Sequence, residues 1–320
     1  MTNNKTSFNK INYSFIKLIS GYDLFDRRLP FMSIKSQEPG PAVWLTGCMH
    51  GDEIGGTVII HELFKYLKTG LLKGSVYSFP LMNPFGFENA SRHISLSDED
   101  LNRAFPGKPK GTLAQRMAYQ IFSRITQTNP DVVLDLHNDW NKSIPYALID
   151  AEPDKILTDK MRHIAEVSGL VAIQESEKLY ATLTYNLLEK NIPALTLELG
   201  ESLLINEKNI TYGFNAIWNI LADLNMVEPL SDPSVFPIPD VLVDKILKYS
   251  SLPLCSSSGI IRFLKKPGEL VKTGDKIAKV SNAFGKLVET ITAVNDGIIL
   301  GHNDYAIAYP GSPVMAFGVY

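Results

Sequence analysis

The chain has 320 residues, of which 45% are hydrophobic, and a formal net charge of -3 at pH 7. That charge gives no indication of nucleic-acid or polyanion binding, and no stretch reaches the roughly 18 apolar residues that a membrane span requires. The first ten residues are polar and lack the apolar region of a signal peptide. Because the only two cysteines, Cys48 and Cys255, lie far apart in apolar segments, we expect a cytoplasmic protein without a disulfide framework.

Hydrophobic periodicity predicts a polar lead-in over residues 1–26, followed by alternating strands and helices. The predicted strands cover residues 28–34, 42–47, 75–81, 131–137, 146–149 and 192–200. The predicted helices cover residues 57–68, 113–126, 155–168 and 212–226, and a further helix ends within 184–190. This alternation predicts an α/β fold with a mixed, mostly parallel sheet that has helices on both faces.

A proline-rich linker at residues 228–240 divides a large domain, residues 1–240, from a small β domain, residues 241–320. Short strands are predicted in the small domain at residues 259–264, 276–280, 286–292, 297–300 and 313–318. Both of its halves carry a Gly-Ile-Ile sequence followed by Pro-Gly, and two such halves predict a barrel-sandwich. We expect this domain to cap a site in the large domain or to support subunit contact in a homo-oligomer.

Three polar residues follow apolar strand segments of the large domain, namely His50, His137 and Glu198. The carboxyl ends of the strands in an open α/β sheet share one edge, so these side chains are expected to meet. Glu53 follows His50 beyond a glycine, and Asp135 lies two residues before His137 on the same side of its strand. A histidine at a strand end is more often a hydrogen-bonded turn residue than a metal ligand, and this alternative stays open for each histidine alone.

Two histidines and one glutamate, His50, Glu53 and His137, form the ligand set of a catalytic zinc site, in which water takes the fourth position. We therefore predict one Zn²⁺ per chain. Glu198 is then expected to take a proton from the metal-activated water and to pass it to the leaving nitrogen. The alternative, a surface carboxylate at a strand end, is disfavoured by the apolar run that precedes Glu198.

The long irregular segment 83–110 contains Asn83, Arg92, Asn102 and Arg103. A loop of this length in a compact domain is usually functional or disordered, and its aromatic and arginine content argues against disorder. Asparagine and arginine can hold a carboxylate, and an arginine near the zinc can polarise the scissile carbonyl. For each arginine taken singly, a solvated surface position remains the alternative.

Five motifs resemble, in the same order, those of the succinylglutamate desuccinylase/aspartoacylase family, a branch of the zinc carboxypeptidase-like hydrolases. They are His50-Gly51-Asp52-Glu53, Asn83-Pro84, Asp100-Leu101-Asn102-Arg103, Asp135-Leu136-His137-Asn138 and Thr196-Leu197-Glu198-Leu199-Gly200. The resemblance implies a zinc carboxypeptidase-like fold for the large domain. The C-terminal part is similar to the β domain that many bacterial members of the family carry.

The resemblance also implies roles for seven residues. The implied zinc ligands are His50, Glu53 and His137. The residues implied to act on the substrate are Glu198 as general base and acid, Asn102 and Arg103 as substrate contacts, and Arg92 near the scissile carbonyl or a substrate carboxylate.

One position departs from the family pattern. Many relatives carry an arginine on the helix before the Glu198 strand, where it is thought to hold a substrate carboxylate, whereas residues 182–186 contain none. Either Tyr185 or Lys190 replaces that arginine, or the substrate lacks the carboxylate.

Together these features predict a zinc-dependent amidohydrolase that cleaves a small N-acylated amino acid or a related amide. One alternative keeps the site but acts on short peptides as a zinc metallocarboxypeptidase. A second alternative is a non-catalytic protein that uses the zinc site for binding. In the leading prediction the partner is a small-molecule substrate, and neither nucleic acid nor a membrane is expected to bind.

Overall fold

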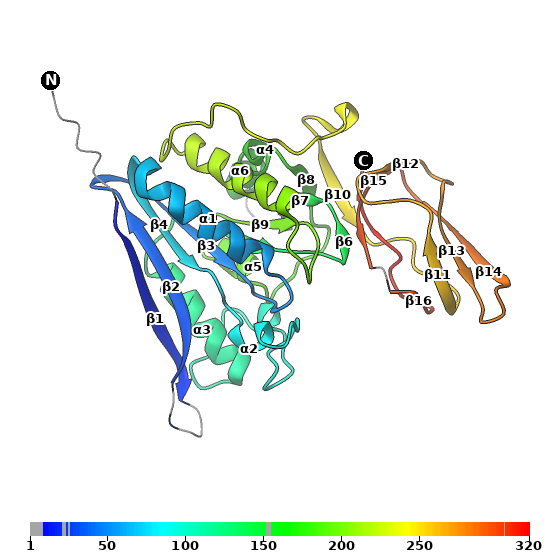
Figure 1. Ribbon diagram of the computed structural model, residues 1–320, viewed down its shortest axis with the longest axis horizontal. Coiled ribbons are helices and arrows are strands. Elements are labelled where there is room, and N and C mark those ends of the chain that lie inside the picture. Colours follow the sequence, from blue (N-terminus) through cyan, green and yellow to red (C-terminus); the bar gives the residue numbers. More distant parts are fainter. Residues whose placement is uncertain (1–8, 21–23, 25, 152–154, 304) are drawn as a thin grey trace.

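The computed structural model describes residues 9–20, 24, 26–151, 155–303 and 305–320, and these form a long mixed sheet and a smaller one (Figure 1). The long sheet has thirteen strands. Their order is β1 (Ile11–Ser20), β2 (Asp26–Lys35), β4 (Lys73–Phe79), β3 (Glu38–Gly47), β5 (Val132–His137), β9 (Ala194–Leu199), β7 (Pro145–Ile149), β8 (Val171–Gln174), β10 (Ile246–Ser250), β17 (Ala316–Val319), β15 (Gly297–His302) and β12 (Leu270–Val271), and β6 (Lys142–Ser143) pairs with β15.

Helices cover both faces of this sheet, as predicted. One layer contains α1 (Gly55–Gly70), α6 (Glu207–Asp223) and α4 (Lys155–Ser168), which pack on one another in that order. The opposite face carries α3 (Leu113–Thr126) and the short α5 (Leu183–Leu188), while α2 (Pro84–Phe87) and the 3-10 turns Leu101–Arg103 and Asp240–Leu242 lie in connections. The predicted helices at 113–126 and 155–168 agree with α3 and α4 residue for residue.

The prediction of a mostly parallel sheet is correct only for the centre. The strands β4, β3, β5 and β9 pair in parallel, as do β7, β8 and β10. Antiparallel pairs join β9 to β7 and build both ends, through β1–β2–β4 on one side and β10–β17–β15–β12 on the other. The sheet is mixed because two parallel groups of strands meet in antiparallel fashion at β9 and β7, and because antiparallel additions extend both ends.

The first of these additions comes from the segment that the sequence presented as a polar lead-in. Strand β1 contains apolar residues such as Phe15 and Ile16, but Leu18 is its only buried residue, so burial in the core contributes little to holding it. It forms because it pairs along its length with β2, from Ile11 opposite Ile34 to Ser20 opposite Asp26. Residues 1–8, 21–23 and 25 of the predicted lead-in lie outside the described residues.

The C-terminal segment contributes to two sheets. The strands β14 (Leu287–Thr292), β13 (Lys276–Ser281), β11 (Gly259–Phe263) and β16 (Ile307–Ala308) form the smaller antiparallel sheet, at the end of the molecule away from β1 (Figure 1). Its apolar residues, such as Ile277 and Ile291, pack with Ile299 and Phe317 of the long sheet. The division at residue 240 and the barrel-sandwich arrangement stay predictions. None of the described helices is long and apolar enough to cross a membrane.

Two glycines allow the loop before α1 and the first turn of α1 to lie close against neighbouring segments. A Cβ atom on Gly51 would lie 1.9 Å from the carbonyl carbon of Gly86, so only glycine fits where this turn crosses the 83–110 segment. A Cβ atom on Gly56 would lie 2.6 Å from Leu136 Cβ and 3.0 Å from the Leu136 carbonyl oxygen. The first turn of α1 therefore rests directly on β5.

We expect Gly56→Ala to destabilise the fold by about 1–3 kcal/mol, because α1 must move away from the Leu136 backbone. Alanine raises helix propensity, so the clash has to outweigh a gain of about 1 kcal/mol. Thermal unfolding measures the change. Thr69→Ala, on the exposed face of the same helix, is the control, and equal stability of the two variants would contradict this packing constraint.

Candidate active site

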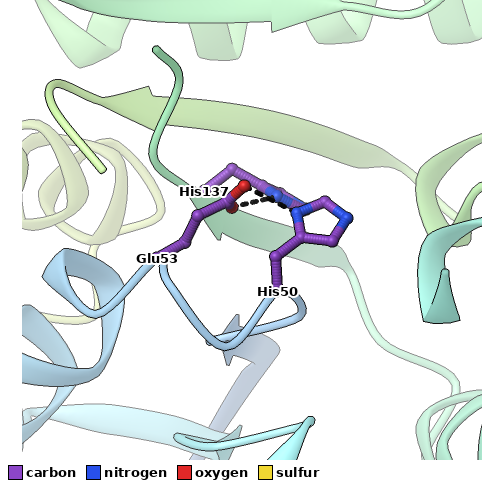
Figure 2. A group of neighbouring side chains, drawn as sticks. All are labelled: His50, Glu53 and His137. Carbon is purple, nitrogen blue, oxygen red and sulfur yellow. Dashed lines mark hydrogen bonds and ion pairs between the residues drawn. The ribbon is translucent and has the colours of Figure 1, made fainter. Parts of the chain in front are cut away.

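His50, Glu53 and His137 meet at the carboxyl ends of β3 and β5. The Glu53 carboxylate joins the two rings, with Oε1 2.6 Å from His50 Nδ1 and Oε2 2.7 Å from His137 Nδ1. Figure 2 shows that His50 and Glu53 come from the loop before α1, whereas His137 ends β5. All three residues are buried, and their potential donor atoms lie within 4.8 Å of one another.

The outer nitrogen of each imidazole is held by a second carboxylate. Asp135 Oδ2 lies 3.0 Å from His137 Nε2, and Asp100 Oδ1 lies 3.2 Å from His50 Nε2. Such partners fix the orientation of a metal-binding histidine and leave the other nitrogen free to coordinate. Two oriented imidazoles and one carboxylate, all buried, are a donor set that suits zinc. The residues present therefore fit the predicted metal.

Asn138 connects the loop that carries Glu53 to the end of the strand that carries His137. Its backbone N–H donates to Glu53 Oε2 at 3.2 Å, and its side-chain oxygen accepts from the N–H of Gly55 at 3.0 Å. The start of α1 is thereby hydrogen-bonded to the end of β5. As a result, the loop that carries Glu53 keeps its position next to His137.

Arg92 lies beside the triad. Its Nε and Nη2 donate to Asp100 Oδ2 at 3.1 and 2.9 Å, and its Nη1 is 3.8 Å from Glu53 Oε1. Burial opposes ionisation of Asp100, but His50 and Arg92 hold the pKa of its carboxyl well below the usual range. Asp100 is therefore an anion that positions both the histidine and the arginine, a role that the sequence did not indicate.

A cavity of about 210 Å³ opens next to the triad. All seven residues predicted to form the site line it, namely His50, Glu53, Arg92, Asn102, Arg103, His137 and Glu198. The Asn102 side-chain oxygen also accepts from the N–H of Leu183 at 2.9 Å, which ties the 83–110 segment to the start of α5. Asn83 does not line the cavity, because it caps α2 through its contact with Gly86. A cavity of this size suits a small substrate.

Glu198 stands opposite His137 in the register of the parallel strands β5 and β9. Residues paired in this way point to the same face of a sheet, so the Glu198 carboxylate projects into the cavity beside the triad. Its Oε2 is buried and has no hydrogen-bond partner in the described part of the chain. Burial raises the pKa of Glu198 well above its usual value, and the nearby Asp139 carboxyl raises it further.

The family model of the succinylglutamate desuccinylase/aspartoacylase catalytic domain matches residues 39–224. The chain belongs to this family. It is 28% identical over 287 residues to an N-alpha-acetyl-L-2,4-diaminobutyric acid deacetylase from Halomonas elongata, across 85% of this chain and 80% of that relative. The family resemblance stated from the motifs is thus confirmed, and the named activity of this relative supports amide hydrolysis.

Solved structures of the family share the fold along the whole chain. One is a succinylglutamate desuccinylase/aspartoacylase from Rhodobacter sphaeroides, with a TM-score of 0.82, 21% identity and coverage of 100% of this chain and 99% of that one. Another is the product-bound ectoine utilization protein EutE (DoeB) from Ruegeria pomeroyi, with a TM-score of 0.81, 22% identity and coverage of 99% and 98%. At these levels of sequence identity, the structural similarity shows a shared fold.

Sequence reasoning missed several residues that line the cavity of this family member. Asp150 and Glu175 follow β7 and β8 directly. These two strands run antiparallel to β5 and β9, so the rule about strand carboxyl ends that found His137 could not have found them. Tyr249 comes from β10 in the C-terminal segment, and no local pattern places it there. Of the two suggested replacements for the absent arginine, neither Tyr185 nor Lys190 lines the cavity, and Thr182 and Thr184 line it instead.

We expect Asp135→Asn to lower zinc affinity by about 10- to 100-fold, because the amide no longer holds His137 as a carboxylate does. Competition with a chelator of known affinity measures this change. Asp98→Asn, which alters an exposed partner of His93 outside the cavity, serves as the control. Unchanged zinc affinity in Asp135→Asn would show that the Asp135 contact does not support the metal site.

Proposed function

We propose that this protein is a zinc-dependent deacylase that hydrolyses the amide bond of a small N-acylated amino acid or a related amine. The observation that carries the proposal is the placement of Glu198 beside an oriented His50–Glu53–His137 triad, in one small cavity. The deacetylase from Halomonas elongata supports it, since its name describes removal of an acetyl group from an amino acid.

His50, Glu53 and His137 would hold a zinc ion, which would act there as a Lewis acid toward an amide carbonyl and would lower the pKa of a water molecule. Glu198 takes the proton of the attacking water and returns it to the nitrogen of the leaving amine. It acts as a base only when ionised, and cationic charge at the triad favours that form despite the raised pKa. The single carboxylate thus serves both proton transfers.

We propose that Arg92 stabilises negative charge on the acyl oxygen. Asp100 holds two of its nitrogens through Oδ2, which fixes the guanidinium beside the triad. An arginine fixed in this way needs little reorganisation when charge develops in the transition state. Asn102 and Arg103 line the same cavity and are proposed to contact the substrate.

We expect Glu198→Gln to keep zinc but to lose about 10²- to 10⁴-fold in kcat, because the amide cannot take the proton. The measurement is release of free amine from N-acetyl, N-succinyl and N-formyl amino acids, with zinc content determined in parallel. Glu62→Gln on the surface of α1 is the matched control. A Glu198→Gln enzyme with undiminished kcat would end this mechanism.

The same assay separates the two alternatives. A metallocarboxypeptidase would release the last residue of short peptides and leave N-acyl amino acids intact. A non-catalytic binding protein would hold zinc in stoichiometric amount and turn over neither panel. Hydrolysis of N-acyl amino acids above the Glu198→Gln blank supports the deacylase over both.

We expect Arg92→Lys to lower kcat by about 10²- to 10³-fold while zinc stays bound, because lysine cannot keep two donors on Asp100 and a third toward the acyl oxygen. Arg116→Lys, at an exposed position of α3, controls for the substitution itself. Loss of zinc from Arg92→Lys, rather than loss of kcat, would instead assign Arg92 to support of the triad.

A further inference from the structure

The cavity continues beyond the triad along β7. Tyr146, Leu148 and Asp150 all line it and are spaced two residues apart, so they project from one face of the sheet. Tyr146 lies opposite Glu198, and Leu148 lies opposite Thr196. Asp150 is one further step along this face, about 13 Å from Tyr146 in Cα position along the strand. The cavity therefore has a second end, separated from the proposed reaction centre.

That second end is acidic. Ile149 of β7 pairs with Gln174 of β8, so Asp150 and Glu175, the next residues, stand side by side at the sheet edge. The Glu175 N–H donates to the Ile149 carbonyl at 2.8 Å, which continues the parallel pairing to this point. Both side chains line the cavity. Two carboxylates are thus held close together by the backbone rather than by a flexible loop.

The buried Asp150 carboxylate can accept a further hydrogen bond. The residue is 4% exposed, and its Oδ2 has no hydrogen-bond partner in the described ranges of the chain. Burial raises the pKa of Asp150 to about 6, the Thr184 hydroxyl lowers it, and the Glu175 carboxyl raises it. A buried carboxylate without a cationic partner is costly, so a positive charge that enters this end of the cavity is stabilised there.

The cationic residues of the cavity wall lie on another segment. Arg92 and Arg103 belong to the 83–110 segment, and Arg92 is bound to Asp100. Neither Tyr185 nor Lys190, the suggested holders of a substrate carboxylate, lines the cavity. The unpartnered Asp150 oxygen and the neighbouring Glu175 carboxylate therefore favour a cation at this end of the cavity.

We propose that Asp150 and Glu175 form a subsite for an ammonium group, so that the preferred substrates carry a free amine in addition to the scissile amide. This inference rests on the proposed deacylase function and narrows its substrate class to mono-N-acylated diamino compounds. Asp150 accepts from the ammonium group through its unpartnered oxygen, and Glu175 adds a second negative charge at the half-buried entrance to the subsite.

The test compares substrates that differ only in the distal amine. Nα-acetylornithine and Nα-acetylnorvaline form one such pair, and Nα-acetyl-diaminobutyrate and Nα-acetyl-aminobutyrate form another. A charge-assisted hydrogen bond in a buried site predicts a preference for the aminated member of about 10- to 100-fold in kcat/KM. Equal rates within each pair, or a preference for N-acetylglutamate over both, would overturn the subsite.

Asp150→Asn is expected to abolish this preference by raising KM for the aminated substrates while leaving KM for the neutral ones unchanged. Glu175→Gln, at a less buried position, should reduce it in the same direction and guards against a folding defect in Asp150→Asn. Glu177→Gln is the matched control, since Glu177 is exposed on the same loop and lies outside the cavity. Equal loss on both members of a pair would assign Asp150 a purely structural role and overturn the proposal.

A binding measurement separates this inference from the proposed function. Calorimetry with zinc-loaded Glu198→Gln protein compares ornithine with norvaline and needs no turnover. Tighter binding of ornithine that is lost in the Glu198→Gln/Asp150→Asn double variant supports the subsite, even if no amide is hydrolysed by the wild type. Ornithine that binds no tighter than norvaline overturns it, whatever the outcome for hydrolysis.

Discussion

The contact of one buried carboxylate with two imidazoles is the interaction on which the site depends. Burial alone disfavours the charge of Glu53, yet His50 and His137 hold the pKa of its carboxyl well below the usual range. Two features hold the Glu53 carboxylate in place. Gly56 lets α1 pack directly on β5, and Asn138, which follows β5, hydrogen-bonds to both Glu53 and Gly55. Packing between α1 and β5 therefore determines the geometry of the candidate metal site.

Much of this arrangement could be predicted from the sequence, because it follows from local periodicity and from one rule about sheets. Amphipathic spacing located α3 and α4, because apolar residues recur at helical spacing along each of them. The rule that strand carboxyl ends share an edge predicts that His50, His137 and Glu198 lie together. The two-residue alternation along a strand placed Asp135 on the same side as His137, and the structure adds that Asp135 is the acceptor for the outer nitrogen of His137.

The features that the sequence could not predict depend on pairing between distant segments. Strand β1 is held by its pairing with β2, and Leu18 is the only one of its apolar residues that is buried. The parallel pairing of β10 with β8 brings Tyr249 into the cavity, although residues 171–174 and 246–250 are far apart in the chain. Asp100 reaches His50 from a loop without periodicity. Such contacts depend on the tertiary fold, which no window of local sequence encodes.

The balance of charge links the proposed metal site to the proposed ammonium subsite. Five carboxyl groups line the cavity, on Glu53, Asp139, Asp150, Glu175 and Glu198, against the two arginines of the 83–110 segment. Burial raises the pKa of Asp139 and of Asp150 to about 6, and that of Glu198 well above its usual value. These groups reach their anionic forms at lower pH when cations neutralise them. A divalent ion at the triad supplies such charge at one end of the cavity, and an ammonium group between Asp150 and Glu175 supplies it at the other. The same excess of buried carboxyl groups is therefore the basis of both proposals.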